Sequence, residues 1–116
     1  MSAAEQTTPT AAELAGAITD YYALMPSGSD QGWDRLTARF QSTTAQNRPY
    51  YERFWGGISR VIAEDVQGAA PDKAEATITY YFDDGRVAVE RTAYTLVPEG
   101  GTLKIDTSTV LSSDNG

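Results

Sequence analysis

The chain has 116 residues and contains neither cysteine nor histidine. These absences exclude disulfides, thiolate nucleophiles and imidazole bases, and they remove the usual ligands of zinc. A metal ion would have to be held by oxygen atoms alone. We therefore expect no metal site and no cofactor, and any chemistry would fall to carboxylates and hydroxyls.

Basic residues are also few, because nine Lys and Arg stand against sixteen Asp and Glu and give a net charge of -7. Proteins that bind phosphate backbones or anionic lipids use clusters of Lys and Arg. Nucleic acid is therefore not an expected partner. No apolar run reaches the length of a membrane span or of a signal-peptide core, so we expect a soluble fragment.

What is present is enough for one domain. Hydrophobic residues make up 41% of the chain, and a chain of this length buries roughly two thirds of its extended surface on folding. Residues 1–9 are small and polar, which favours a linker. We expect a folded domain over residues 10–113 and a frayed tail over residues 114–116.

The first half of the chain reads as helical. Thr10 and Glu13 have the spacing of a capping box, and apolar residues follow at helical intervals to about Leu24. A second helix is expected to begin after Asp30, with Trp33, Leu36 and Phe40 as its apolar stripe. The residues from Gln41 to Asn47 are polar and predict a loop.

A third helix is predicted between Asn47, a good N-cap, and the pair Gly56 and Gly57, with Pro49 in its first turn. Large apolar residues recur along it at i, i+3, i+4 and i+7, which predicts one buried face made by Tyr51, Phe54, Trp55 and Ile58.

After Gly57 the apolar period changes to two, which predicts strands over residues 58–66, 74–82, 86–97 and 103–111. Asp83-Asp84-Gly85 and Glu99-Gly100-Gly101 are hairpin turns. In the third strand the apolar parity switches between Val87/Val89 and Tyr94/Leu96, which we interpret as a bulge. The fold class is therefore α+β: three N-terminal helices packed on the concave face of a curved four-stranded antiparallel sheet, with a cavity between the layers.

This order of elements resembles the nuclear transport factor 2-like fold, also called cystatin-like. More narrowly, the chain resembles the small extracytoplasmic C-terminal domains of actinobacterial membrane-bound serine/threonine protein kinases. The residues that carry the resemblance lie between Glu13 and Ser113 and are Tyr21-Tyr22, Trp33 to Thr37, Tyr51 to Trp55, Asp84-Gly85, Leu103 to Asp106 and Ser108 to Val110.

The resemblance implies a cell-surface domain attached to a cytoplasmic kinase through a membrane span outside this sequence. The Thr7-Thr8-Pro9-Thr10 run would suit the linker to that span. No kinase motif occurs in the 116 residues, so no catalytic residue is carried over from the kinase. The expected function is that of a non-catalytic sensor that binds a small or envelope-derived ligand.

Aromatic residues predict where such a ligand would bind, although aromatics at helical spacing also fill ordinary cores. Buried tyrosine hydroxyls need partners, so tyrosines around one cavity would imply water or a polar ligand among them. The candidate pocket comprises Trp33, Tyr51, Phe54, Trp55, Tyr80, Tyr94 and Asp106.

An enzyme is the alternative, because the resemblance includes isomerases, dehydratases and hydrolases that use a carboxylate inside the cone. Asp106 is the best candidate, but strand alternation turns it towards solvent if Leu103 and Ile105 face the core. The pair Asp83 and Asp84 would make a poor calcium cage.

The face of the sheet without helices is expected to bind a second copy of the chain. Val87 and Val89 have the opposite parity to Tyr94 and Leu96, so one group is expected on the face without helices. An apolar patch there would suit a second copy of the chain, which predicts a homodimer through the sheet.

Overall fold

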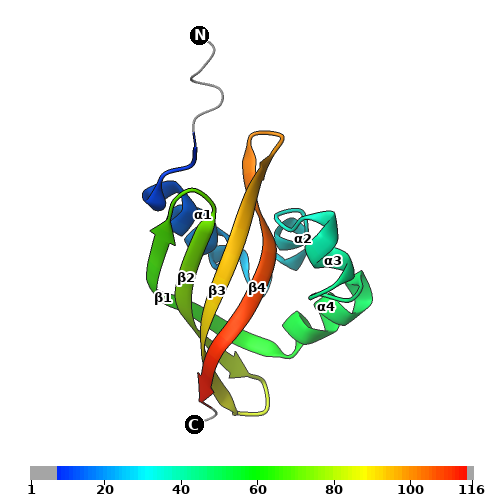
Figure 1. The fold of residues 1–116 in the computed structure, drawn as a ribbon. Coiled ribbons are helices and arrows are strands. Elements are labelled where there is room, and N and C mark those ends of the chain that lie inside the picture. The colour runs from blue at the N-terminus through cyan, green and yellow to red at the C-terminus, as the bar shows by residue number, and fades with distance from the viewer. Residues whose placement is uncertain (1–7, 115–116) are drawn as a thin grey trace.

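A computed structural model describes residues 8–114, and it confirms the α+β class (Figure 1). The predictions for residues 1–7 and 115–116 lie outside the described residues. The elements are α1 (Ala11–Leu24), α2 (Ser29–Trp33), α3 (Ala38–Ser42), α4 (Arg48–Gly56), β1 (Ile58–Ala69), β2 (Lys73–Phe82), β3 (Val87–Glu99) and β4 (Thr102–Asp114). No helix in the described part of the chain is long and apolar enough to cross a membrane.

Helices α1 and α4 begin and end where their caps predict. The Thr10 hydroxyl accepts a hydrogen bond from the Glu13 N–H at 3.1 Å, and the Glu13 carboxylate accepts one from the Thr10 N–H at 2.8 Å. The Asn47 side chain accepts a hydrogen bond from the Tyr50 N–H at 2.9 Å, and Pro49 lies in the first turn of α4. Each N-cap gives a partner to an N–H group of the first turn that would otherwise lack one, which stabilises each helix by about 1 kcal/mol.

The single second helix was a wrong prediction, because the structure has two short helices, and four helices in all between residues 8 and 114. Leu36 separates them by pairing with Ile105 of β4 as an isolated parallel bridge. The Ile105 N–H donates to the Arg35 carbonyl at 2.9 Å, and the Thr37 N–H donates to the Ile105 carbonyl at 3.0 Å. This bridge buries Leu36 almost completely, at 1% exposure.

The four strands form one curved open antiparallel sheet in the order β1-β2-β3-β4, as predicted (Figure 1). The two tight turns have glycines with positive φ, which only glycine adopts readily: +94° at Gly85 and +84° at Gly101. Three strands end later than predicted: β1 continues through Ala69, β3 through Glu99 and β4 through Asp114. Asp114 pairs with Val89 and is therefore not part of a frayed tail.

The bulge predicted in the third strand was also wrong. β2 and β3 stay in register from the pair Lys73 and Thr95 to the pair Tyr81 and Val87. The register shifts lie in the two outer strands, where Ser59 of β1 and Asp106 and Leu111 of β4 have no partner of their own. The parity switch has a simpler cause: β3 carries apolar residues on both faces. Its buried residues are Ala88, Thr92, Tyr94 and Leu96, all on the helix side.

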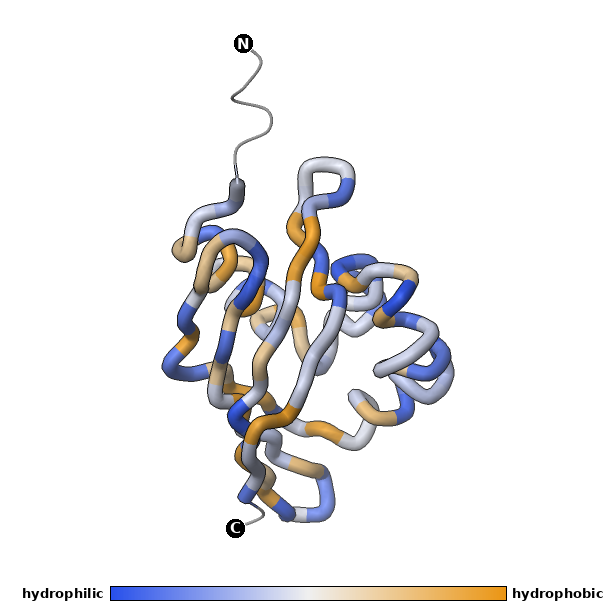
Figure 2. Tube along the Cα trace, in the orientation of Figure 1, coloured by the Kyte–Doolittle hydropathy of each residue, from blue (hydrophilic) through white to orange (hydrophobic). Residues whose placement is uncertain are grey.

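The core lies between the helices and this side of the sheet. Leu14 and Ile18 of α1 are fully buried against Ala76 and Ile78 of β2, and α1 runs behind β1 and β2 (Figure 1). A Cβ on Gly68 would lie 2.0 Å from the Ala11 carbonyl oxygen, so glycine is required where α1 meets β1. In Figure 2, hydrophobic segments lie along β3 and β4, and hydrophilic segments lie on α2, α3 and α4.

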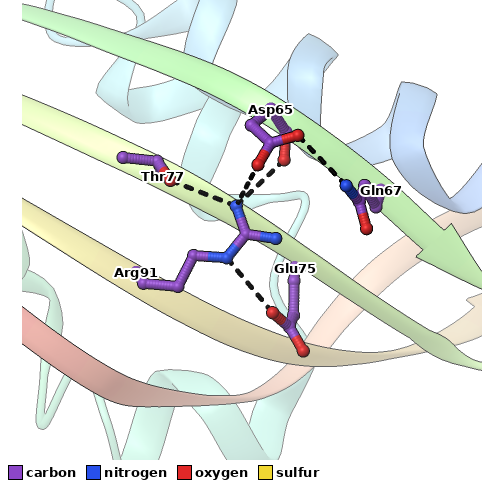
Figure 3. Close-up of polar contacts among 5 residues, drawn as sticks. All are labelled: Asp65, Gln67, Glu75, Thr77 and Arg91. Carbon is purple, nitrogen blue, oxygen red and sulfur yellow. Dashed lines mark hydrogen bonds and ion pairs between the residues drawn. The ribbon is translucent and has the colours of Figure 1, made fainter.

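The opposite, helix-free face of the sheet is held by Arg91 of β3, whose side chain is 22% exposed (Figure 3). Its Nη1 donates to the Asp65 carbonyl at 3.0 Å and to the Thr77 hydroxyl at 3.1 Å, and its Nε donates to the Glu75 carboxylate at 3.1 Å. Nη1 also lies 3.4 Å from the Asp65 carboxylate. Asp65 has a φ of +50°, where β1 loses its register with β2. Arg91 thus ties three strands together at an irregular point.

Replacement of Trp55 by alanine should lower the free energy of unfolding by about 3–5 kcal/mol, because its ring is 5% exposed and leaves a large cavity. Chemical denaturation measures the change. Phe54→Ala is the matched control: that ring is 39% exposed, so its loss should cost much less. Equal losses in the two variants would contradict the burial of Trp55.

Replacement of Arg91 by methionine should lower the free energy of unfolding by about 1–3 kcal/mol, because charge-assisted hydrogen bonds from β3 to β1 and β2 are lost. Arg60→Met is the control on the same face, since Arg60 only stacks on the Tyr81 ring, at 5.4 Å. Its loss should cost about 0.5 kcal/mol or less. A loss for Arg91 no larger than for Arg60 would show that the network does not stabilise the sheet.

Candidate functional site

A cavity of about 250 Å³ lies between the helices and the sheet, where the sequence predicts one. We call it the tyrosine cavity, because six of its lining residues are tyrosines. It is lined by Tyr21 and Tyr22 of α1, by Phe40, Thr44, Ala45, Tyr50, Tyr51, Phe54 and Trp55 from α3 to α4, and by Tyr80, Glu90, Thr92, Tyr94, Ile105, Ser108 and Val110 of the strands.

Two hydroxyl pairs organise these tyrosines. The hydroxyls of Tyr21 and Tyr51 lie 2.8 Å apart, and so do those of Tyr22 and Tyr94. Tyr21 and Tyr22 are neighbours in the last turns of α1, and their rings meet edge to face at 4.9 Å. In each pair one hydroxyl donates and the other accepts, so one hydroxyl hydrogen per pair is left for a further acceptor.

Burial keeps these hydroxyls protonated. It raises the pKa of Tyr51 and of Tyr94 to about 12 each, since a phenolate would lose its hydration there. Burial raises the pKa of Tyr80 as well, and it raises those of Tyr21 and Tyr22, with their tyrosine neighbours adding to the effect. Near neutral pH the cavity therefore presents neutral phenols that both donate and accept hydrogen bonds.

Glu90 is the one charged residue in the lining of the cavity. It sits on β3 between Ile78 of β2 and Ser113 of β4, with the same parity as Thr92 and Tyr94. Burial alone raises the pKa of the Glu90 carboxyl. None of the ion pairs within residues 8–114 includes it. The cavity therefore holds a partly desolvated carboxylate with no protein cation beside it.

Apolar side chains surround the opening of the cavity. Within the described residues the large apolar side chains that remain exposed are Tyr50, Phe54, Val110 and Leu111, at 44%, 39%, 49% and 54%. All but Leu111 line the tyrosine cavity. Exposed apolar surface gathered at one opening is typical of a binding site rather than of scattered surface residues.

Five of the seven predicted pocket residues line this cavity: Tyr51, Phe54, Trp55, Tyr80 and Tyr94. Trp33 does not, because its ring packs edge to face on Tyr51 at 5.0 Å and lies under the Arg48 guanidinium at 5.5 Å. Phe54 was expected in the buried face of α4 but lies at the opening.

Asp106 lies outside the cavity, so its proposed place as an enzymatic carboxylate there is corrected. It is the extra residue of a β4 bulge, and its carboxylate accepts a hydrogen bond from the Thr37 hydroxyl at 2.8 Å. The Arg39 guanidinium lies 3.9 Å away. Asp106 therefore contacts the start of α3 and does not line the cavity.

Sequence reasoning missed Tyr21, Tyr22 and Glu90 as lining residues. The two tyrosines belong to the apolar stripe of α1, which gave no reason to separate them from the core. Glu90 carried a usable signal, because it shares the parity of Tyr94, a predicted pocket residue on the same strand. The supposed bulge in this strand hid that parity.

No group of three or more metal-ligating side chains occurs in the part of the chain that the structure describes. Asp84, considered for calcium, is engaged by Arg86, whose N–H and Nε donate to its carboxylate at 3.0 and 2.8 Å. Those hydrogen bonds lower the pKa of Asp84. The absence of a metal and of a cofactor stays a prediction.

The helix-free face has a depression of about 260 Å³ at the end of the sheet near Lys73 and Thr107. The Thr95 and Thr107 hydroxyls, 2.6 Å apart, bond to each other within it. Val87 and Val89 lie on the same face and are half-buried. Dimerisation through this face stays a prediction.

The stability of the domain should fall as the pH rises above about 10. Unfolded tyrosine has a pKa of about 10, whereas Tyr21, Tyr22, Tyr51, Tyr80 and Tyr94 have raised pKa values in the folded state. Below pH 10 their contribution is fully present, and above it the unfolded state loses protons first. Denaturation curves across this pH range should show the fall, with tyrosinate absorbance appearing together with unfolding. Tyrosinate absorbance from all seven tyrosines before unfolding would contradict the burial.

Comparisons with models of protein families, with curated proteins and with solved structures find no match to this chain. A function for the cavity must therefore be argued from its own residues.

Proposed function

We propose that this domain is a non-catalytic binding module that holds a small, partly apolar molecule in the tyrosine cavity. The proposal is supported best by one observation: the same cavity has an opening with apolar edges, walls of aromatic rings, and tyrosine hydroxyls that hydrogen-bond in pairs. Ligand sites commonly combine apolar walls with a few fixed polar groups.

The cavity favours a ligand that is small and carries a polar group. Its volume, about 250 Å³, is just below the usual range of about 300–1,000 Å³ for such sites. A ligand ring or chain against the aromatic walls would be stabilised by about 25 cal/mol for each Å² of apolar surface removed from water. A polar group would bond the spare hydrogen of a tyrosine pair, whose oxygen atoms the fold already holds in place.

We further propose that occupancy of the cavity is the signal of an extracytoplasmic sensor attached to a serine/threonine kinase. This step is supported by the sequence resemblance. A ligand shifts a kinase between two states only through different affinities for those states. Empty and filled forms of the cavity, or monomer and dimer, are the two pairs of states that suit a domain of this size.

Binding is tested with N-phenyl-1-naphthylamine, a neutral probe that fluoresces in apolar surroundings. Its fluorescence should rise with the native domain and should be strongly reduced with Val110→Phe, which narrows the opening. Leu111→Phe is the matched control, because it enlarges the neighbouring exposed side chain outside the cavity. Equal fluorescence with both variants would place the probe elsewhere, and no rise with the native domain would contradict the proposal.

The sensor role has a separate test in the kinase that carries the domain. Autophosphorylation should differ between the native protein and Val110→Phe, and it should be unchanged in Leu111→Phe. Equal activity of all three under every envelope stress applied would contradict the sensor role without touching ligand binding.

An enzyme is the second candidate, and Glu90 is the observation that favours it. Its carboxyl has a raised pKa and shares the cavity with neutral tyrosine donors, a combination suited to general acid or base chemistry. The enzyme hypothesis predicts that the domain turns over a small substrate, that Glu90→Gln abolishes this activity and that Asp106→Asn keeps it. That result would rule out a purely non-catalytic binding module.

A further inference from the structure

We propose that the ligand of the tyrosine cavity is an organic cation, an amine or quaternary ammonium with an apolar body, whose charge lies between Glu90 and the aromatic rings. The inference rests on the proposed binding function and specifies its ligand class.

The lining of the cavity carries a single charge, and it is negative. Glu90 is the one charged lining residue, and no lysine or arginine lines the cavity with it. Its neighbour Arg91 points to the opposite face of the sheet, where Asp65 and Glu75 hold its guanidinium (Figure 3). Strand alternation thus separates the two charges and leaves Glu90 facing the cavity. A partly buried carboxylate is stabilised when a cation pairs with it.

The aromatic walls favour the same sign of charge. The rings of Tyr80 and Trp55 have centroids 6.0 Å apart, and those of Tyr80 and Phe54 are 5.6 Å apart. The Tyr22 and Tyr94 centroids are 6.4 Å apart, so these rings pack on one another as a cluster, and all five line the cavity. The negative face of each ring attracts a cation, by about 0.5–2 kcal/mol according to how far the cation is desolvated.

The protein's own cations leave these rings uncovered. Arginines lie over Trp33 at 5.5 Å, over Tyr81 at 5.4 Å and over Phe82 at 4.4 Å. All three rings are outside the cavity lining. Within the described residues, no cation–π contact involves a ring that lines the cavity, so no arginine or lysine of the protein competes there with a cation from outside.

The same charges act against an anionic ligand. A carboxylate or phosphate in the cavity would lie beside Glu90 with no lysine or arginine in the lining to offset the repulsion. A neutral apolar molecule would keep the packing but would leave Glu90 unpaired. The order of affinity should therefore be cation, then neutral molecule, then anion.

Displacement of N-phenyl-1-naphthylamine tests this order with matched probes. Benzyltrimethylammonium and neopentylbenzene have the same shape and differ by one atom, a charged nitrogen in place of carbon, and benzenesulfonate supplies the anion. In buffer of fixed ionic strength, the cation should displace the dye at a concentration at least about tenfold lower than neopentylbenzene, equivalent to about 1.4 kcal/mol. Benzenesulfonate should be the weakest competitor.

Variants of Glu90 test whether its charge causes the preference for the cation over neopentylbenzene. Glu90→Gln should remove most of the preference for the cation while leaving neopentylbenzene unchanged, and Glu90→Asp, which keeps the charge, should keep most of it. Glu64→Gln removes an equal charge from an exposed position outside the cavity lining and should keep the native order.

The outcomes separate this inference from the function on which it rests. If the dye binds in the cavity but the cation is no better than neopentylbenzene, the ligand class is wrong and the binding module stands. A preference that survives Glu90→Gln would overturn the part given to Glu90. Failure of the dye and of every probe to bind the native domain would overturn the binding function itself.

Discussion

The hydrogen bonds between buried tyrosine hydroxyls are the constraint on which the rest of the structure depends. Tyr21 pairs with Tyr51 across 30 residues of sequence, and Tyr22 pairs with Tyr94 across 72. A buried hydroxyl without a partner costs about 1–3 kcal/mol, so α1, α4 and β3 are held where both pairs can form. The same four tyrosines line the cavity, so the contacts that join the two layers also form part of its wall.

The helix positions could be predicted where a local cap or turn decides them, and not where a distant strand does. Thr10, Asn47 and Gly85 act within a few residues of themselves. The break between α2 and α3 depends on Ile105, which lies 69 residues beyond Leu36. Because Trp33, Leu36 and Phe40 fit helical spacing, nothing nearby in the sequence revealed that Leu36 gains more burial by leaving the helix and joining the sheet edge.

The candidate site could be predicted only in part, for a related reason. Aromatic spacing identified residues of α4 and of two strands that do meet, but it did not distinguish a cavity wall from a core. Glu90 shares the parity of the predicted pocket residue Tyr94, whereas the parity switch at Val87 and Val89 suggested a bulge in that strand. Alternation did turn Asp106 towards solvent, but the true bulges lie in β1 and β4 and have no local signal, so the supposed bulge in β3 kept Glu90 from being assigned to the cavity.

Core and binding site are not competing descriptions of these rings. Trp55 and Tyr94 are almost fully buried, at 5% and 3% exposure, and both also line the cavity. A ligand that binds only the folded domain adds RT ln(1 + [L]/Kd) to its stability, about 2.7 kcal/mol at a concentration of 100 Kd. A bound ligand would contact the same rings that join the helices to the sheet. Its binding would therefore change the contacts between the two layers directly. A domain with paired tyrosines at that junction is therefore suited to turning occupancy into a change in how firmly the helices are held.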